Sequence, residues 1–175
     1  MKYIFMTAAV ALSLSACSEK TEQPAASAGA ASAAPVVFSK AETARPASLP
    51  AELAAVPHCS FDLLNDGARG ESETISNKAR VTMNGWSGDP KATAAPGSVF
   101  LEFDGPAKLY ATAQRGLKRP DVASAYSNPI LQDSGWEAHI DLSAATPGQY
   151  KVRVIEVNGA NATSCDPHSV LVISS

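Results

Sequence analysis

Trp136-Glu137-Ala138-His139-Ile140-Asp141-Leu142 is followed, after a Pro-Gly turn, by Gln149-Tyr150-Lys151-Val152-Arg153-Val154. Apolar and polar residues alternate along both pieces, which is the period-2 pattern of a strand with one buried face. The even-numbered residues of the first piece would face a core, whereas Glu137, His139 and Asp141 would share the opposite, solvated face. A sheet with one dry face is therefore expected here.

Five further runs between residues 57 and 175 have the same texture and are separated by turn-forming Asn, Asp, Gly or Pro residues. An Asp104-Gly105 pair between two of them predicts a β-hairpin. Residues 119–126 depart from the pattern. Pro120 suits the first helical position and Asp121 suits the positive end of a helix dipole, so a short helix is expected. The seven expected strands are 59–65, 79–86, 97–103, 108–112, 136–142, 149–157 and 162–173.

Seven short antiparallel strands with one short helix predict an all-β fold, a single immunoglobulin-like β-sandwich. The piece from Leu142 to Val152 resembles the turn that enters a late strand of immunoglobulin-like domains. In that resemblance Tyr150 takes the tyrosine-corner role, in which its hydroxyl bonds the backbone a few residues upstream. The cysteines depart from the immunoglobulin pattern, because Cys59 lies in the first expected strand and Cys165 in the last.

The first sixteen residues have the features of an export signal, with Lys2 followed by an uncharged apolar run over residues 3–14. This run is shorter than the roughly 20 apolar residues that a membrane-spanning helix needs. The next residues complete Leu14-Ser15-Ala16-Cys17, which resembles the lipobox of bacterial lipoproteins. The resemblance implies cleavage before Cys17 and acyl chains on that residue that anchor the protein in a membrane. An ordinary secretory signal with a chance cysteine is the alternative.

Ser18 follows the cysteine, where lipoproteins retained in the inner membrane carry aspartate. The lipoprotein resemblance therefore implies the outer membrane, with the protein facing the periplasm or the cell surface. Three segments are expected: a signal peptide over 1–16, an Ala/Ser/Pro-rich tether over 17–56, and a β-sandwich domain over 57–175. A segment of the tether's composition can bury too little apolar surface to offset the loss of conformational entropy on ordering. The tether is therefore expected to be disordered.

The chain has three cysteines and a formal net charge of −3. With Cys17 used for lipid, Cys59 and Cys165 remain as a pair in an exported domain, and a disulfide is the simplest outcome. The alternative is a zinc site of two cysteines with His58 and His168. Adjacent His58 and Cys59 would have to turn to one ion, and export favours oxidation, so no metal is expected. No basic stripe is present, which argues against nucleic acid as a partner.

Several spaced pieces occur as a set: Gly85-Trp86-Ser87-Gly88-Asp89-Pro90, Val99-Phe100-Leu101 with Asp104-Gly105, Arg119-Pro120-Asp121-Val122-Ala123, and Ser134-Gly135-Trp136. Together they resemble a β-sandwich module of bacterial envelope proteins, found also at the C-terminal ends of some membrane glycosyltransferase-like proteins. The resemblance covers roughly residues 58–173. It implies a fold and an envelope setting, and no reaction.

Four residues are candidates for contact with a ligand. Trp86 and Trp136 lie beside glycines and could stack on a sugar, with core packing as the alternative for each. Arg119 and Asp121 could hold a polar group of a ligand. In the structural alternative, Arg119 ties the start of the helix to a neighbouring strand or carboxylate.

Nucleophile motifs and phosphate-binding loops are missing from the sequence, and none of the three histidines lies in a catalytic pattern. The row Glu137, His139 and Asp141 could bind a metal weakly, although a solvated strand face explains it as well. We expect a non-catalytic accessory lipoprotein without a cofactor that binds another envelope protein. A glycan-binding module for a cell-envelope polysaccharide is the alternative.

Overall fold

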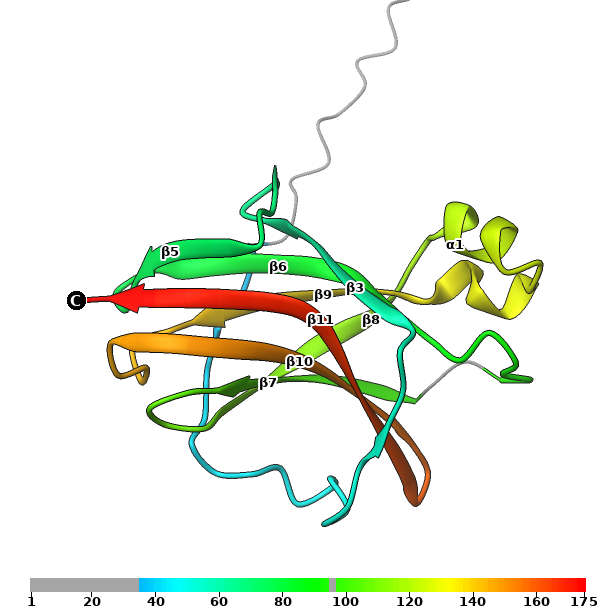
Figure 1. The fold of residues 1–175 in the computed structure, drawn as a ribbon, viewed down its shortest axis with the longest axis horizontal. Coiled ribbons are helices and arrows are strands. Elements are labelled where there is room, and N and C mark those ends of the chain that lie inside the picture. Colours follow the sequence, from blue (N-terminus) through cyan, green and yellow to red (C-terminus); the bar gives the residue numbers. More distant parts are fainter. Residues whose placement is uncertain (1–34, 95–96) are drawn as a thin grey trace, which may run out of the picture. The chain divides into compact units, whose positions relative to one another are not determined.

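The fold is all-β, with strands that form one continuous hydrogen-bonded sheet in the computed structural model, which describes residues 35–94 and 97–175 (Figure 1). The expected signal peptide, Cys17 and tether residues 17–34 lie outside the described residues. In chain order the elements are β1 (Ser39–Lys40), β2 (Ala54–Ala55), β3 (Cys59–Leu64), β4 (Gly67–Ala68), β5 (Ser72–Ser76), β6 (Arg80–Ser87), β7 (Ser98–Asp104), β8 (Leu109–Leu117), α1 (Pro120–Ala125), a 3-10 helix η1 (Pro129–Asp133), β9 (Gly135–Asp141), β10 (Gly148–Asn158) and β11 (Asn161–Ser174).

All seven expected strands are present, and their ends lie within two residues of the expected ones, except that β8 continues to Leu117. The short helix begins at Pro120 as expected. The described residues hold eleven strands rather than about seven, so the expected strand count is too low, and the immunoglobulin-like arrangement is not confirmed. The four added strands are β1, β2, β4 and β5. Strands β1, β2 and β4 have two residues each, which is too short for an alternating pattern to be visible in the sequence. Strand β5 has five residues and was not expected.

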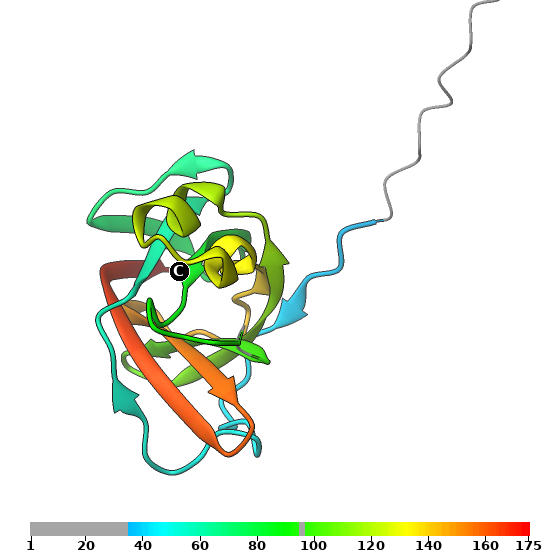
Figure 2. The ribbon, with the colours of Figure 1, turned by 90° about the vertical axis from the view of Figure 1, so that its right-hand side faces the viewer.

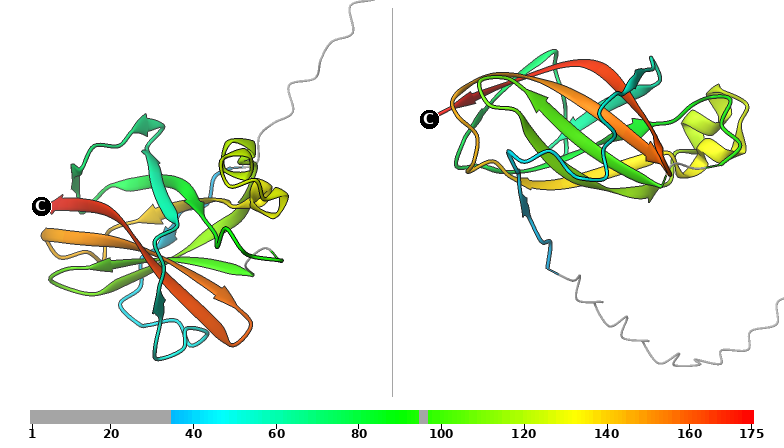
Figure 3. Two further views of the ribbon diagram at one scale, coloured as in Figure 1. Left: turned by 45° about the vertical axis from the view of Figure 1, so that its right-hand side comes forward. Right: turned by 90° about the horizontal axis from the view of Figure 1, so that it is seen from below.

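The sheet follows the order β2-β11-β10-β7-β8-β9-β6-β3-β4, with β5 added to β11 and β1 added to β9. Strand β8 belongs to both halves, because its first residues pair with β7 and its last residues pair with β9. The sheet bends over at β8, so β3, β6 and β9 form one layer and β7, β10 and β11 form the other (Figure 3).

The main core lies between these two layers. Alternate residues of β6, β7, β8, β9 and β10 point into it, and the largest fully buried side chains include Trp136, Tyr150, Phe61 and Phe103. Burying an aliphatic or aromatic side chain contributes about 1.5–3 kcal/mol each, so this cluster stabilises the pairing of the layers. Its members from β9 are Trp136, Ala138 and Ile140, as the alternation of the sequence predicts.

The layers are also joined where β8 diverges from β9. There β1 inserts, with Ser39 paired to Ile140, and the Ala41 N–H donates to the Asp141 carbonyl at 3.0 Å. Glu42 and Tyr110 exchange both of their backbone hydrogen bonds at 2.8 Å. Ala41 is buried as a result, and residues 39–42 close this side of the molecule.

The next segment, residues 43–57, crosses the outer face of the layer that contains β7 and β10 (Figure 3, right). Leu49 and Leu53 pack there on Phe100 and Ile155, and β2 then pairs with β11. A compact unit therefore begins at Pro35 in the described residues. This unit includes residues 35–56 of the expected tether, because single apolar residues such as Leu49 are enough to dock an otherwise tether-like sequence.

Two local expectations are confirmed. The Tyr150 hydroxyl donates to the Thr146 carbonyl at 2.8 Å, as the tyrosine-corner resemblance implies. Asp104 and Gly105 connect β7 and β8 as an antiparallel hairpin. Neither α1 nor η1, the helices of the described ranges, has the length and apolar composition to cross a membrane.

Candidate functional site

Three aromatic rings from separate parts of the chain meet at one end of the domain, beside α1. The Tyr126 ring lies 5.6 Å from the Trp86 ring and 5.8 Å from the His58 ring, centroid to centroid. Tyr126 is 38% exposed, and the other two residues are half-buried. We call His58, Trp86 and Tyr126 the aromatic surface.

The local structure explains why each ring is there. Residues Val81, Met83 and Gly85 of β6 point into the core, so Trp86 points out of the opposite face. Tyr126 is the residue that ends α1, and its N–H bonds the Val122 carbonyl. His58 directly precedes the disulfide-bonded Cys59 and is held by it.

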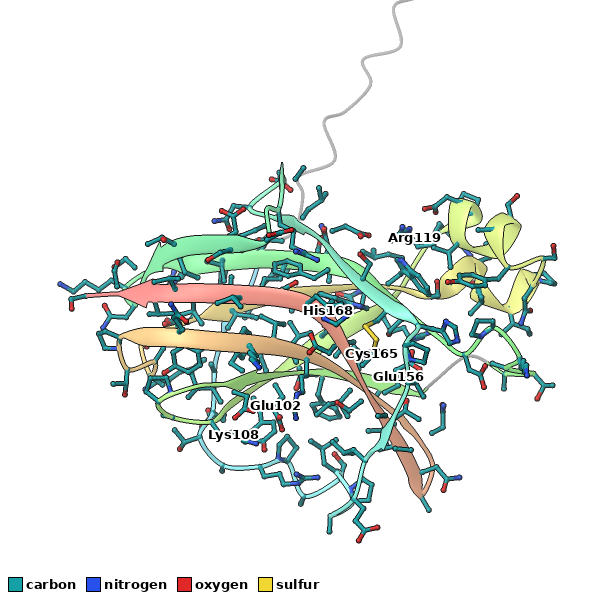
Figure 4. All side chains as sticks on the ribbon, in the orientation of Figure 1. Glu102, Lys108, Arg119, Glu156, Cys165 and His168 are labelled. Atoms are coloured by element: carbon teal, nitrogen blue, oxygen red, sulfur yellow. A yellow bond between two sulfur atoms is a disulfide. The ribbon has the colours of Figure 1, made fainter. Side chains whose placement is uncertain are left out.

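Arg119 lies beside this surface and bridges two carboxylates, between β3 and the start of α1 (Figure 4). Its Nη1 donates to Asp62 at 2.6 Å and its Nη2 donates to Asp121 at 2.7 Å. Hydrogen bonding from Arg119 lowers the pKa of Asp121 to about 2, and the same contact raises the pKa of Arg119. The expected tie between the helix start and a neighbouring strand is confirmed. Arg119 and Asp121 also serve as each other's charged hydrogen-bond partner.

A small hollow of about 250 Å³ adjoins the aromatic surface on the same outer face. Asn84 lines it, two residues before Trp86 on β6, so the hollow and the Trp86 ring are neighbours along one strand face. Its other lining residues supply both charged and apolar groups: Asp62, Leu63, Gly85, Leu117, Lys118 and Arg119. The region therefore combines exposed aromatic rings with groups that can donate and accept hydrogen bonds.

Trp136 does not belong to this surface. It is 0% exposed and packs with its ring 6.4 Å from that of Phe61, and a side chain at Gly85 would collide with it. The ligand-stacking role considered for Trp136 is wrong, because the residue shares the inward parity of Ala138 and Ile140. The two tryptophans thus separate, with Trp86 on the surface and Trp136 in the core.

In the row on β9, His139 contacts Glu137 and also Thr82 of β6. His139 Nε2 lies 2.8 Å from Glu137 and its Nδ1 lies 3.0 Å from the Thr82 hydroxyl, while the Phe38 ring packs edge-on against the imidazole. The Thr82 N–H is already bonded to the Asn65 side chain. Asp141 pairs instead with Arg80, at 3.8 Å. The three β9 residues share a face as expected, but they do not converge on one point.

The expected disulfide is present. Cys59 and Cys165 are bonded, with their Cα atoms 6.1 Å apart. The alternative zinc site is excluded by this bond, and its two histidines have other surroundings: His58 faces Tyr126, and the His168 side chain is 90% exposed. Nowhere in residues 35–94 or 97–175 do three potential metal-ligating side chains form a cluster.

A larger groove of about 620 Å³ runs beside β2 and β11, and sequence reasoning missed it. Its apolar wall comes from Leu53, Val56 and Pro57, and its polar wall includes Arg153 and Asp166. Arg153 is engaged with Glu102 and Asp104 at 3.5 and 3.6 Å. The groove exists only because residues 43–57 cross the sheet, which the sequence pattern does not reveal.

No protein-family model, curated protein or solved structure matches the chain.

Proposed function

We propose that the protein is a non-catalytic, lipid-anchored accessory lipoprotein of the cell envelope, which binds another envelope protein through the aromatic surface. The observation that carries the proposal is the exposed Tyr126 ring between His58 and Trp86. Tyr, Trp and Arg are the residues enriched where protein interfaces gain most of their binding energy, and Arg119 packs next to Gly135, the β9 residue paired with Trp86.

The way the surface is supported favours binding over catalysis. Trp86 belongs to a long paired strand, and the disulfide holds the residue next to His58. Rigid aromatic anchors lose little conformational entropy on binding, which favours affinity. The lipobox-like sequence before Cys17 supports the anchored placement, and residues between Cys17 and the domain would supply reach.

Site-specific crosslinking tests the proposal. A photo-reactive amino acid at position 126 in the anchored protein should form one reproducible adduct with an envelope protein in living cells. The matched control is position 151, because Lys151 is exposed on β10, away from the aromatic surface. Equal adducts from both positions, or none from position 126, would count against the proposal.

A glycan is the second candidate partner, and the hollow beside Trp86 is the observation in its favour. Sugars bind on aromatic faces with polar groups at their edges, and Asn84 and Arg119 provide such groups here. Trp86 is the half-exposed tryptophan, so a bound sugar should change its fluorescence. Titration of Trp136→Phe protein with envelope polysaccharides should show this change, and Trp86→Phe protein should not. A flat response to every polysaccharide tried would remove this candidate.

A further inference from the structure

The core changes from apolar to polar at the end nearest the disulfide. Strands β6, β8 and β10 point alternate residues inward, and their last inward positions are Ser87, Arg115 and Glu156. Ser134, just before β9, completes this layer. Ser87 and Ser134 are 1% and 0% exposed, so both serines are shielded from bulk solvent.

Part of the layer is satisfied by an ion pair. Arg115 Nη1 donates to Glu156 at 3.1 Å, and Arg115 Nη2 donates to the Ser87 carbonyl at 3.3 Å. The side chains of Arg115 and Glu156 are only 10% and 8% exposed (Figure 4 labels Glu156). The pair neutralises its own charge, so neither an anion nor a cation is needed beside it.

Other polar atoms of the layer have no hydrogen-bond partner among residues 35–94 and 97–175. Arg115 Nε and the hydroxyls of Ser87 and Ser134 are buried without a hydrogen bond, and so is Trp136 Nε1. These residues are neighbours: Arg115 is opposite Trp136 in the β8–β9 register, and the Ser87 N–H donates to the Ser134 carbonyl at 3.1 Å. Buried polar groups in folded proteins are nearly always paired, with protein or with ordered water.

The chemistry of these groups selects the ligand. The Arg115 Nε–H only donates, whereas a serine hydroxyl both donates and accepts. A water molecule can accept from the guanidinium and can donate to a hydroxyl oxygen, so ordered water can satisfy each of these groups. A charged ligand would meet either Arg115 or Glu156 with the wrong sign.

We propose that Ser87, Arg115 and Ser134 form an internal site for one or more ordered water molecules. Ser87 ends β6, directly after Trp86, and Ser134 ends the connection that contains α1 and η1. Water in this site would link the end of that connection to the sheet, in addition to the hydrogen bond from the Ser87 N–H to the Ser134 carbonyl. Figure 2 shows α1 and η1 stacked together at this end of the domain.

Nuclear magnetic resonance of the anchored protein in detergent micelles, labelled with ¹⁵N-arginine, tests the site. The Arg115 Nε–H should be protected from exchange and should show a cross-relaxation peak to water with the sign of a long-lived contact. Loss of one signal in Arg115→Lys assigns it. Arg119 is the matched control, because its Nε donates to Asp121 at 3.0 Å, and it should show no long-lived water contact.

The serines provide the second arm. In Ser87→Ala with Ser134→Ala, or in either single variant if the double variant does not fold, the water peak of Arg115 should weaken or vanish while the native spectrum is kept. An Arg115 Nε–H that exchanges at the rate of a free side chain, or one that is protected without a water contact, would overturn the proposal. So would a water peak that is unchanged in the folded serine variants.

Discussion

Cys59 and Cys165 are covalently bonded although their strands, β3 and β11, are not hydrogen-bonded neighbours. The bond therefore closes the two layers of the sheet on the side opposite to the β8 bend. Arg69 adds a second link on this side, since its Nη2 donates to the Pro167 carbonyl at 2.9 Å. Because the cysteines are 106 positions apart, the disulfide restricts most of the unfolded domain.

Replacing Cys59 with serine should destabilise the domain. The chain-entropy argument gives about 4–5 kcal/mol for a loop of this length, and measured losses are often smaller. Urea unfolding of the variant should show a lower midpoint, and the native protein treated with a reductant should show the same shift. An unchanged midpoint in both would contradict the structural role assigned to this bond.

Cys17→Ser should change where the protein is located and leave its stability unchanged. The lipoprotein resemblance predicts that this variant is released from the membrane fraction or mislocalised, while the domain that begins at Pro35 keeps its fold. Cell fractionation and circular dichroism measure the two properties separately. A Cys17→Ser protein that stays in the membrane fraction would contradict the lipid anchor, and one that loses its fold would contradict the division between anchor and domain.

Tyr150→Phe removes the hydroxyl that donates to the Thr146 carbonyl. Because the ring is fully buried and remains in place, the cost should be close to that of one hydrogen bond, about 0.5–1.5 kcal/mol in the free energy of unfolding. Denaturant unfolding measures it. Tyr126→Phe is the control, because the Tyr126 hydroxyl makes no hydrogen bond with the described residues. The stability of this variant should stay within error of that of the native protein.

Asp121 should contribute to the acid sensitivity of the domain. Its pKa is held at about 2 in the folded protein, chiefly by hydrogen bonds from Arg119, against about 3.9 for an unperturbed aspartate. Because the pKa of Asp121 is lower in the folded than in the unfolded protein, the ionised carboxylate stabilises the folded state above pH 4. This contribution is lost as the pH falls from about 4 to 2. The side chain is 63% exposed, so solvent screening limits the effect to less than about 1 kcal/mol.

Stability measured against pH for Asp121→Asn tests this contribution. The variant should lose less stability than the native protein between pH 4 and pH 2, and the two curves should differ by a constant amount above pH 5. Parallel curves over the whole acid range would show that the Arg119 contact does not depress the pKa of Asp121.

Much of the fold was predictable because, along a long strand, the alternation of apolar and polar residues shows which side chains are buried. The parity of β9 alone predicts an inward Trp136, since Ala138 and Ile140 share its face. The Arg119 tie and the Tyr150 corner also followed from local sequence. The short strands did not, because a two-residue strand such as β2 is stabilised by its partner and not by its own pattern.

The candidate site was only half predictable. Trp86 was identified, but Tyr126 and His58 were not expected to meet it, because they lie 40 and 28 positions away in sequence. No spacing rule connects residues brought together by a disulfide, a strand and the end of a helix. The alternation along β6 indicates that Trp86 faces outward. It does not indicate which other residues lie beside Trp86 on that surface.

The aromatic surface is proposed to bind a partner in the envelope. The most direct measurement is recovery of that partner with the anchored protein after general chemical crosslinking of the cells, compared between Tyr126→Ala and Lys151→Ala, which changes an exposed residue elsewhere. Both variants should be membrane-bound and folded, and only Tyr126→Ala should lose the partner, by about tenfold or more. Equal recovery with both variants would contradict binding through the aromatic surface.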